Sequence, residues 1–347
     1  MKATRESSNL DFLRTCAVLL VVAFHLMLFF QYAQKGTFNL HDLGHLGVLL
    51  FFVHTSLVLM FSLERQINRN PNAFFGSFYA RRCFRIYPLS LLVVLAVDKL
   101  KLPVGHLRDG IFSAVHLNHE QILSNLLLVQ NISHTDSIIA PLWSLPYEMQ
   151  MYVLLPFLFL LARKNQKWFF IGALWVASTA LGYLPHVLHR TPDFVIYVPC
   201  FMAGILAYKL TESQTSNWPF FLWPVVLAAT SIFYLQRPTV GRSWICCLLV
   251  GISIPKFAEM QSVWLKKTFH EIARYSYGLY LTHFICIWLA FSELAHRPAA
   301  LRWIVFCVTL VGLPIALYHL VESPLINFGN RLLNRTPSEE RPIIAHA

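Results

Sequence analysis

Charged residues are scarce in this chain of 347 residues. Asp, Glu, Lys and Arg make up 13% of it, whereas a soluble globular domain carries about 25%. Hydrophobic residues make up 56%, and the mean hydropathy is +0.53. The apolar residues come in long blocks, which is typical of a polytopic membrane protein and argues against a soluble domain.

The motifs of several soluble enzyme classes are also missing. The chain has no GxSxG, no Walker A loop, no GxGxxG after a strand and no HxxxxD of soluble glycerolipid acyltransferases. Its seven cysteines form no CxxC pair and no zinc spacing, so neither a disulfide framework nor a cysteine metal site is expected. Any chemistry must therefore use polar groups within the hydrophobic segments.

Ten hydrophobic segments are near the length of about 17–25 residues that a helix needs to cross a bilayer. Lipid satisfies no backbone N–H or C=O group, so all ten are expected to be helical. Most Lys and Arg residues lie on one side when the N-terminus is cytosolic, so the positive-inside rule predicts that both termini are cytosolic. The predicted fold is an all-α polytopic membrane protein with about ten transmembrane helices. The expected spans are 12–31, 43–63, 84–100, 142–162, 168–184, 193–210, 218–236, 242–257, 272–292 and 302–322.

We expect one integral membrane domain over residues 1–327 and a short, flexible cytosolic tail over residues 328–347. The first apolar run is longer than the h-region of a signal peptide, and no A-x-A-like site follows it, so we expect no cleavage. The net charge of +11 is mostly explained by the topological bias, so nucleic acid is not expected as a partner. The expected location is the plasma or inner membrane, with multiple passes.

The first span places Arg14 and His25 eleven residues apart. At about 100° and about 1.5 Å per residue, the two side chains share one helix face and lie about 16 Å apart along the axis. A cation at one interface is then in line with an imidazole near the midplane. An ionisable side chain at that depth is costly and is by default a candidate functional group.

Other ionisable and aromatic residues lie in or beside the spans. Structural roles compete for each: a buried histidine is often a hydrogen-bonded core residue, and aromatic residues form interface belts. A carboxylate within a span needs a partner or a water-filled cavity. Together, histidines and a glutamate converge on the middle and outer half of the membrane, while arginines gather at the cytosolic mouth, which suits a polyanionic donor from the cytosol. These candidates are His54, Arg82, Arg85, Trp143, Ser144, Glu148, Tyr152, Tyr280 and His283.

At these residues the chain resembles acyltransferase family 3, a family of integral membrane O-acyltransferases. LDFLRTCAVLLVVAFH resembles the family's opening Arg-x10-His helix, and FYARRCFRIYPLSLL its Arg-x-x-Arg-Ile-Tyr-Pro segment with Tyr87. PLWSLPYEMQMYVLLP is similar to its Trp-Ser-Leu-x-x-Glu-x-x-x-Tyr stretch. YSYGLYLTHF is similar to its Ser-Tyr-x-x-Tyr-Leu-x-His pattern, and VESP near Glu322 resembles its closing element. The resemblance runs in order over nearly the whole chain.

The second span departs from the family pattern. The family usually reads Phe-Phe-Val-Ile-Ser-Gly-Phe there, whereas this chain has His54 and then Thr55, Ser56 and Leu57. Loss of the Ser-Gly pair is expected to remove a point of close approach between helices. His54 adds a polar group, so an altered acceptor pocket is expected.

The resemblance implies transfer of an acyl group, commonly acetyl, from cytosolic acyl-CoA to a hydroxyl of a carbohydrate or related acceptor at the outer face. It implies no permanently bound cofactor, because acyl-CoA is a donor substrate. No metal is expected, because the intramembrane His and Glu residues show no tight spacing motif. Arg14, Arg82, Arg85 and Tyr87 would bind the donor, and His25 and Glu148 would be catalytic, with His25 as general base or transient acyl carrier. The acceptor-binding or supporting residues would be His54, Trp143, Ser144, Tyr152, Tyr280 and His283.

Two other functions are compatible with the pattern. Membrane His and Glu residues also form proton relays, so a proton-coupled transporter or exporter is the main alternative. Helices broken at Pro146 or Pro199 would frame its substrate site, but the two halves of the chain show no repeated span pattern. A purely structural assembly partner explains the intramembrane histidines poorly.

Overall fold

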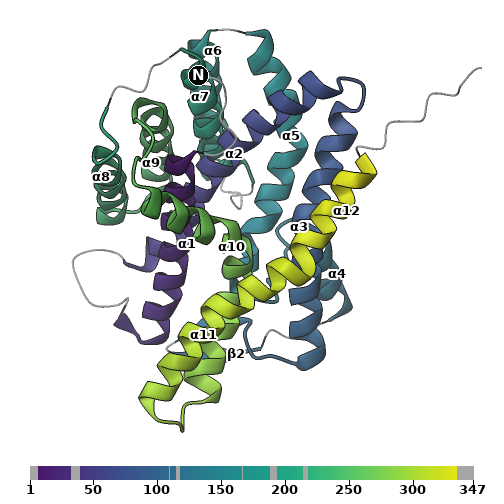
Figure 1. Cartoon of the computed structure of the whole chain (residues 1–347), viewed down its shortest axis with the longest axis vertical. Helices are drawn as coiled ribbons and strands as arrows, with labels where there is room; N and C mark the ends of the chain where they lie inside the picture. Colours follow the sequence, from purple (N-terminus) through teal and green to yellow (C-terminus); the bar gives the residue numbers. More distant parts are fainter. Residues whose placement is uncertain are drawn as a thin grey trace, which may run out of the picture.

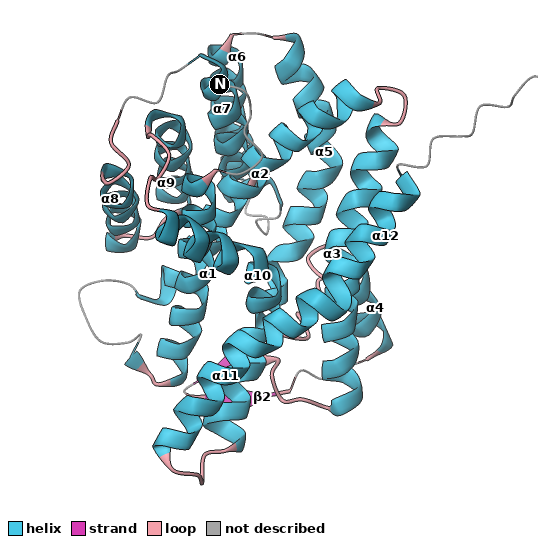
Figure 2. Ribbon diagram, in the orientation of Figure 1, coloured by secondary structure: helices cyan, strands magenta, loops and turns pink. Residues whose placement is uncertain are grey.

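The computed structural model describes residues 7–32, 40–108, 110–114, 118–165, 167–187, 194–213 and 218–333. These residues are mostly helical, which confirms the expected helical class (Figure 2). Five helical segments are long and apolar enough to cross a bilayer, so the count of ten spans and the orientation of the termini stay predictions. The five are Ser8–Phe29, Leu43–Arg69, Ala140–Lys164, Phe194–Glu212 and Ala299–Leu333.

Each expected span contains an α-helix. In chain order these are α1 (Ser8–Phe29), α2 (Leu43–Arg69), α3 (Phe74–Leu100), α5 (Leu145–Lys164), α6 (Trp168–Val187), α7 (Val198–Ser213), α8 (Leu222–Gln236), α9 (Val240–Ser253), α10 (Val263–Ile287) and α11 (Ala299–Leu317). The remaining elements are β1 (His106–Arg108), β2 (Ile111–Ser113), α4 (His119–Leu127) and α12 (Ser323–Leu333). The predicted tail therefore begins inside α12, and residues 334–347 lie outside the described residues.

The helices pack around α1 and α2. Helix α1 lies between α2 and α10, α2 packs against α7, and α7 also contacts α6 and α9. A π-helical turn, Tyr318–Glu322, joins α11 to α12, and the two form a long rod across the molecule whose end packs against α3 (Figure 1). We call the end of the bundle where α1, α3 and α10 begin the inner end, and the opposite end the outer end.

Helices α2 and α7 approach closely despite the missing Ser-Gly pair. A Cβ atom on Gly204 of α7 would collide with the Ser56 hydroxyl and the Val53 carbonyl of α2. The expectation that a close-approach point is lost is therefore wrong, because the glycine is supplied by the facing helix. Small residues at helix interfaces let the backbones approach in the same way whichever partner carries them.

Pro146 and Pro199 do not interrupt helices. Pro146 lies in the first turn of α5, after a 3-10 helix at Ala140–Ser144, and Pro199 is the second residue of α7. Proline in a first turn removes no intrahelical hydrogen bond, since those N–H groups have no helical partner. The broken helices that the transporter alternative invoked at these prolines are therefore absent from α5 and α7.

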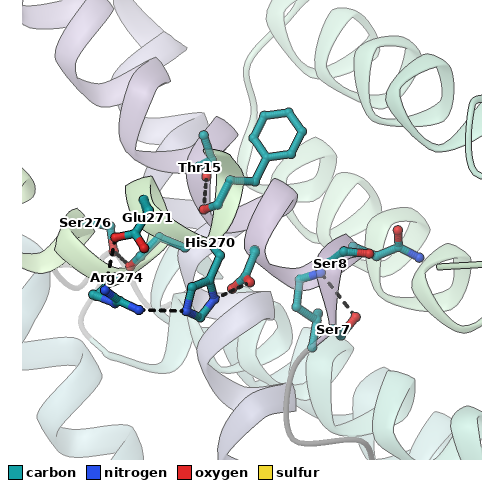
Figure 3. A network of polar contacts seen from close by, with 12 residues as sticks. Ser7, Ser8, Thr15, His270, Glu271, Arg274 and Ser276 are labelled. Atoms are coloured by element: carbon teal, nitrogen blue, oxygen red, sulfur yellow. Dashed lines mark hydrogen bonds and ion pairs between the residues drawn. The ribbon is translucent and has the colours of Figure 1, made fainter. Parts of the chain in front are cut away.

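The inner ends of α1 and α10 are joined by polar contacts (Figure 3). The Glu259 carboxylate before α10 accepts from the Ser8 backbone N–H at 2.8 Å and from the Ser8 hydroxyl at 2.6 Å. His270 Nδ1 lies 3.0 Å from Asp11 Oδ2, and the Thr15 hydroxyl donates to the Phe269 carbonyl at 3.2 Å. These contacts fix the position of α1, and with it the depth of Arg14 and His25.

Candidate active site

A narrow cavity between α1, α2, α3, α5 and α10 contains most of the predicted site residues. Its volume is about 100 Å³, below the roughly 300–1,000 Å³ typical of small-molecule sites. Along α2 its lining runs from Val48 to Leu59, which corresponds to about 16 Å of helix axis. The cavity is therefore long and thin. Its polar lining residues are Arg14, His54, Thr55, Arg82, Arg85, Ser144, Glu148, Tyr152, Ser276, Tyr277 and Tyr280.

Three arginines, Arg14, Arg82 and Arg85, line the inner part of this cavity, which we call the arginine cavity. Arg14 Nε donates to the Ser276 hydroxyl of α10 at 2.6 Å. Arg85 Nη1 pairs with Glu322 Oε2 at 2.9 Å. Arg82 differs from both, because its Nε is buried with no hydrogen-bond partner among the described residues. A buried donor without a partner costs free energy, so this guanidinium is poised to bind an anion.

Among the described residues that line the cavity, Glu148 is the one carboxylate. It lies one turn before Tyr152 on α5, and the Tyr152 hydroxyl donates to Glu148 Oε1. Glu148 also lies close enough to Arg14 and Arg82 for their charges to interact. The sequence requirement that an intramembrane carboxylate have partners is thus met by a tyrosine and by cations from two other helices.

His54 also lines the arginine cavity, from the α2 side. Its side chain is buried, and it lies close enough to Arg14 for their charges to interact. The residue at which the second span departs from the family pattern therefore faces the cavity, and the altered acceptor pocket stays a prediction.

Tyr280 closes the outer part of the cavity. Its hydroxyl donates to the Pro141 carbonyl at 2.6 Å, so the hydrogen bond of 2.7 Å with Ser144 must be donated by the serine. These two bonds tie α10 to the 3-10 helix before α5. The Tyr280 ring centroid lies 6.2 Å from that of His283.

His25 and His283 contact each other beyond Tyr280 and do not line the cavity. Arg14 contacts α10 at Ser276 and His25 contacts it at His283, so both face α10, as their spacing predicts. The cavity therefore extends from Arg14 to Tyr280, and the histidine pair lies behind it.

The hydrogen bonds of the histidine pair indicate its tautomers. His283 Nδ1 lies 3.1 Å from the Leu279 carbonyl, which only accepts, so Nδ1 carries the proton. His283 Nε2 is then an acceptor, 3.0 Å from Nδ1 of His25. His25 Nδ1 also lies 3.0 Å from the Val21 carbonyl and therefore carries a proton as well. In the neutral imidazole this leaves the lone pair of His25 on Nε2, the position that a base or nucleophile uses.

Aromatic rings surround the histidine pair. The Phe24 and Phe284 ring centroids lie 4.8 Å and 5.0 Å from that of His25, both edge-on. Phe112 of β2 lies 5.0 Å from Phe284, so the hairpin covers the pair at the outer end. The pair is thus held in a dry, apolar environment, in contrast to the arginines.

Besides the histidine pair, two further predicted site residues lie away from the cavity. Tyr87 is on the face of α3 that contacts α4, and its hydroxyl donates to the Leu127 carbonyl at 3.1 Å. Trp143 is half-buried among other rings, with centroids 5.9 Å from His45 and 6.0 Å from Tyr197. Neither residue contributes to the arginine cavity as it stands.

The sequence reasoning missed the partners that hold the arginines. Glu322, whose side chain is 1% exposed, neutralises Arg85, and Ser276 binds Arg14. Tyr277 donates from its hydroxyl to the Ile86 carbonyl of α3 at 2.7 Å and lies under the Arg85 guanidinium. A signal existed for Glu322, because a carboxylate within an apolar segment demands a cation.

Comparison with known proteins finds a family and several relatives similar to this chain. An acyltransferase domain family matches residues 7–320. The acyltransferase MdmB of Streptomyces mycarofaciens is 32% identical over 171 residues, 45% of this chain and 40% of MdmB. ORF330 of Acidianus two-tailed virus is 25% identical over 70% of this chain and 73% of that protein. The peptidoglycan O-acetyltransferase OatA of Listeria monocytogenes is 29% identical over 46% of this chain and 25% of OatA. The chain thus spans less than half of MdmB and of OatA, and no solved structure matches it.

Proposed function

Because the chain belongs to the acyltransferase 3 family of integral membrane proteins, we propose that it is an O-acetyltransferase that takes its acyl group from acyl-CoA at the cytosolic face. The proposed acceptor is a hydroxyl of a carbohydrate or related molecule at the outer face. The name of its relative OatA supports a glycan acceptor. The donor is a substrate, so no resident cofactor is needed.

The observation that carries this proposal is the arginine cavity. Coenzyme A is a polyanion, and guanidinium groups bind phosphates through paired hydrogen bonds. Arg14 and Arg82 lie near the starts of α1 and α3, at the inner end, and the cavity extends about 16 Å outward from this region. A pantetheine arm entering between the arginines would bring its thioester toward Tyr280 and the histidine pair.

The histidine pair supplies the proposed chemistry. As the acceptor hydroxyl oxygen attacks the thioester carbonyl, Nε2 of His25 takes the hydroxyl proton, and that proton passes to the departing thiolate of coenzyme A. Alternatively, Nε2 attacks the carbonyl itself and releases the thiolate. The hydroxyl oxygen then attacks the acyl group carried on Nε2, the N–C bond breaks, and the hydroxyl proton passes through the freed Nε2 to the thiolate. In both routes His283 holds His25 in the tautomer whose lone pair is on Nε2.

The transporter alternative has less support. Its substrate site was expected at helices broken by Pro146 or Pro199, and both residues lie in first turns. A narrow cavity lined by arginines also suits a bound polyanion better than a relay that carries protons. Acyl transfer is therefore the function that the geometry supports best.

Binding and consumption of acetyl-CoA by the full chain in proteoliposomes test the proposal. We expect saturable acetyl-CoA binding that Arg82→Glu weakens by at least about tenfold, and release of free coenzyme A when an oligosaccharide is present. Arg237→Glu makes the same charge change at the exposed outer end of α8 and should leave binding unchanged. Flux of a polar solute without thioester consumption would overturn the proposal in favour of transport.

A further inference from the structure

A second, wider cavity opens at the inner end of the bundle. It lies between the ends of α2, α5 and α7 and the start of α6, and its volume is about 370 Å³. It shares no lining residue with the arginine cavity, and the proposed acyl transfer uses none of its residues. We call it the inner-end cavity.

The inner-end cavity is balanced in charge. Lys209 is only 3% exposed, and its Nζ pairs with Glu212, so these two charges neutralise each other. The Arg163 guanidinium is exposed and has no ion-pair partner in the part of the chain that the structure describes. The Glu64 carboxylate lines the cavity beside Tyr208 and has no cation paired with it among those residues. One cation and one carboxylate are therefore available to a ligand.

This balance excludes the ligand proposed for the arginine cavity. A polyanion would gain one guanidinium but would meet the carboxylates of Glu64 and Glu212 in the same space. A ligand with one phosphate and one ammonium group would instead complement Arg163 and Glu64 together. The amide of Asn68 offers the ammonium another acceptor, and the half-exposed Trp168 ring offers it an aromatic face.

The surroundings of the cavity point to a ligand with acyl chains. Exposed apolar side chains flank the lining residues on both helices: Phe157 and Leu161 precede Arg163 on α5, and Phe169 follows Trp168 on α6. In a protein of a membrane-integral family these side chains face lipid. Arginine and tryptophan at the ends of membrane helices, as Arg163 on α5 and Trp168 on α6, are also typical of the membrane–water interface.

We propose that the inner-end cavity binds the head group of a phospholipid that carries one phosphate and one primary ammonium group. The phosphate lies at Arg163, the ammonium at Glu64 and Asn68, and the acyl chains along α5 and α6. A primary ammonium is favoured over a quaternary one because it donates hydrogen bonds to Glu64 and Asn68. This site is independent of the acyl-transfer proposal.

Titration of the detergent-solubilised full chain with defined lipids, followed by native mass spectrometry, tests the site. We expect dioleoyl phosphatidylethanolamine to bind saturably, and at least about tenfold more tightly than dioleoyl phosphatidylglycerol or phosphatidylcholine. Arg163→Gln should weaken binding of phosphatidylethanolamine by a similar factor. Glu64→Gln should reduce the preference for phosphatidylethanolamine over phosphatidylglycerol.

A matched variant controls for loss of surface charge. Lys164 is an exposed cation next to Arg163 that does not line the cavity, so Lys164→Gln should leave lipid binding unchanged. Equal binding of phosphatidylglycerol or phosphatidylcholine, or equal weakening by Lys164→Gln, would overturn the proposal. Displacement of the lipid by an equal concentration of free phosphoethanolamine would show that the site serves a soluble ligand instead. Acetyl-CoA binding, measured alongside, should not change in any of these variants.

Discussion

The interface between α1 and α10 differs sharply between its two ends. At the inner end, Ser8, Asp11, Arg14 and Thr15 bind partners on or just before α10. Arg14 also lines the arginine cavity. Toward the outer end the same two helices enclose His25 among aromatic rings, hydrogen-bonded to His283.

In the proposed function, this difference would separate donor binding from chemistry along one helix pair. Charged groups at the inner end are stabilised by hydrogen bonds and are suited to hold an anion. The histidine pair lies beyond Tyr280 among aromatic rings, and its hydrogen bonds indicate the tautomers of both imidazoles. A donor anchored at one end would thus react at the other.

The largest effect is expected at the histidine end. Loss of a positioned base or nucleophile costs about 10²–10⁴-fold, so His25→Ala should lower kcat for acyl transfer in proteoliposomes by that factor. The binding of acetyl-CoA should stay near the wild-type value, because the arginine end is intact. His319→Ala removes an exposed histidine of the α11–α12 rod and should leave kcat unchanged. Near wild-type transfer by His25→Ala would show that the histidine end does not carry the chemistry of acyl transfer.

The next largest effect is expected for the ion pair between Arg85 and Glu322, which we expect to stabilise the arginine end. Arg85→Met leaves the Glu322 carboxylate buried without its partner, which should lower the free energy of unfolding by about 3 kcal/mol. We place the loss at the low end of the range for buried pairs because the Arg85 side chain is 21% exposed. Unfolding in mixed micelles by added dodecyl sulfate measures it.

The double variant Arg85→Met with Glu322→Leu distinguishes pairing from packing. It removes both charges, so it should be more stable than Arg85→Met alone. If the two variants unfold at the same denaturant concentration, the ion pair is not what orders this end.

A smaller, opposite pair of effects is expected at Glu148. Its carboxylate competes with a polyanion for Arg14 and Arg82, so Glu148→Gln should tighten acetyl-CoA binding by about 3- to 10-fold. Acyl transfer should nevertheless slow, because the predicted catalytic carboxylate is lost. Isothermal titration and a transfer assay on the same preparation measure both. Tighter binding with faster transfer would remove Glu148 from the catalytic group.

Much of this arrangement follows from local sequence pattern. Apolar length predicted a helix in each expected span, and the eleven-residue spacing predicted that Arg14 and His25 face the same neighbour. A carboxylate among apolar residues predicted that Glu148 would have partners. Each of these inferences depends on one helix at a time.

What the sequence did not predict depends on which helices meet. The pairing of His25 with His283 joins residues 258 positions apart, and that of Arg85 with Glu322 joins residues 237 apart. Gly204 replaces the glycine missing from α2, although nothing in α7 alone indicates it. Tyr87 belongs to the arginine motif but points to α4, because residues adjacent in sequence face different sides of a helix.

The smallest expected effect lies at the boundary between the two ends. Tyr280→Phe keeps the ring but removes the hydroxyl that binds both Pro141 and Ser144, so the free energy of unfolding should fall by about 1 kcal/mol. Ser144→Ala removes only one of these bonds and should cost less. If Tyr280 separates donor from histidines, Tyr280→Phe should also raise the hydrolysis of acetyl-CoA without acceptor about 2- to 3-fold, an effect of roughly 0.5 kcal/mol on the barrier. Unchanged hydrolysis together with unchanged stability would mean that the boundary is set by helix packing and not by this hydroxyl.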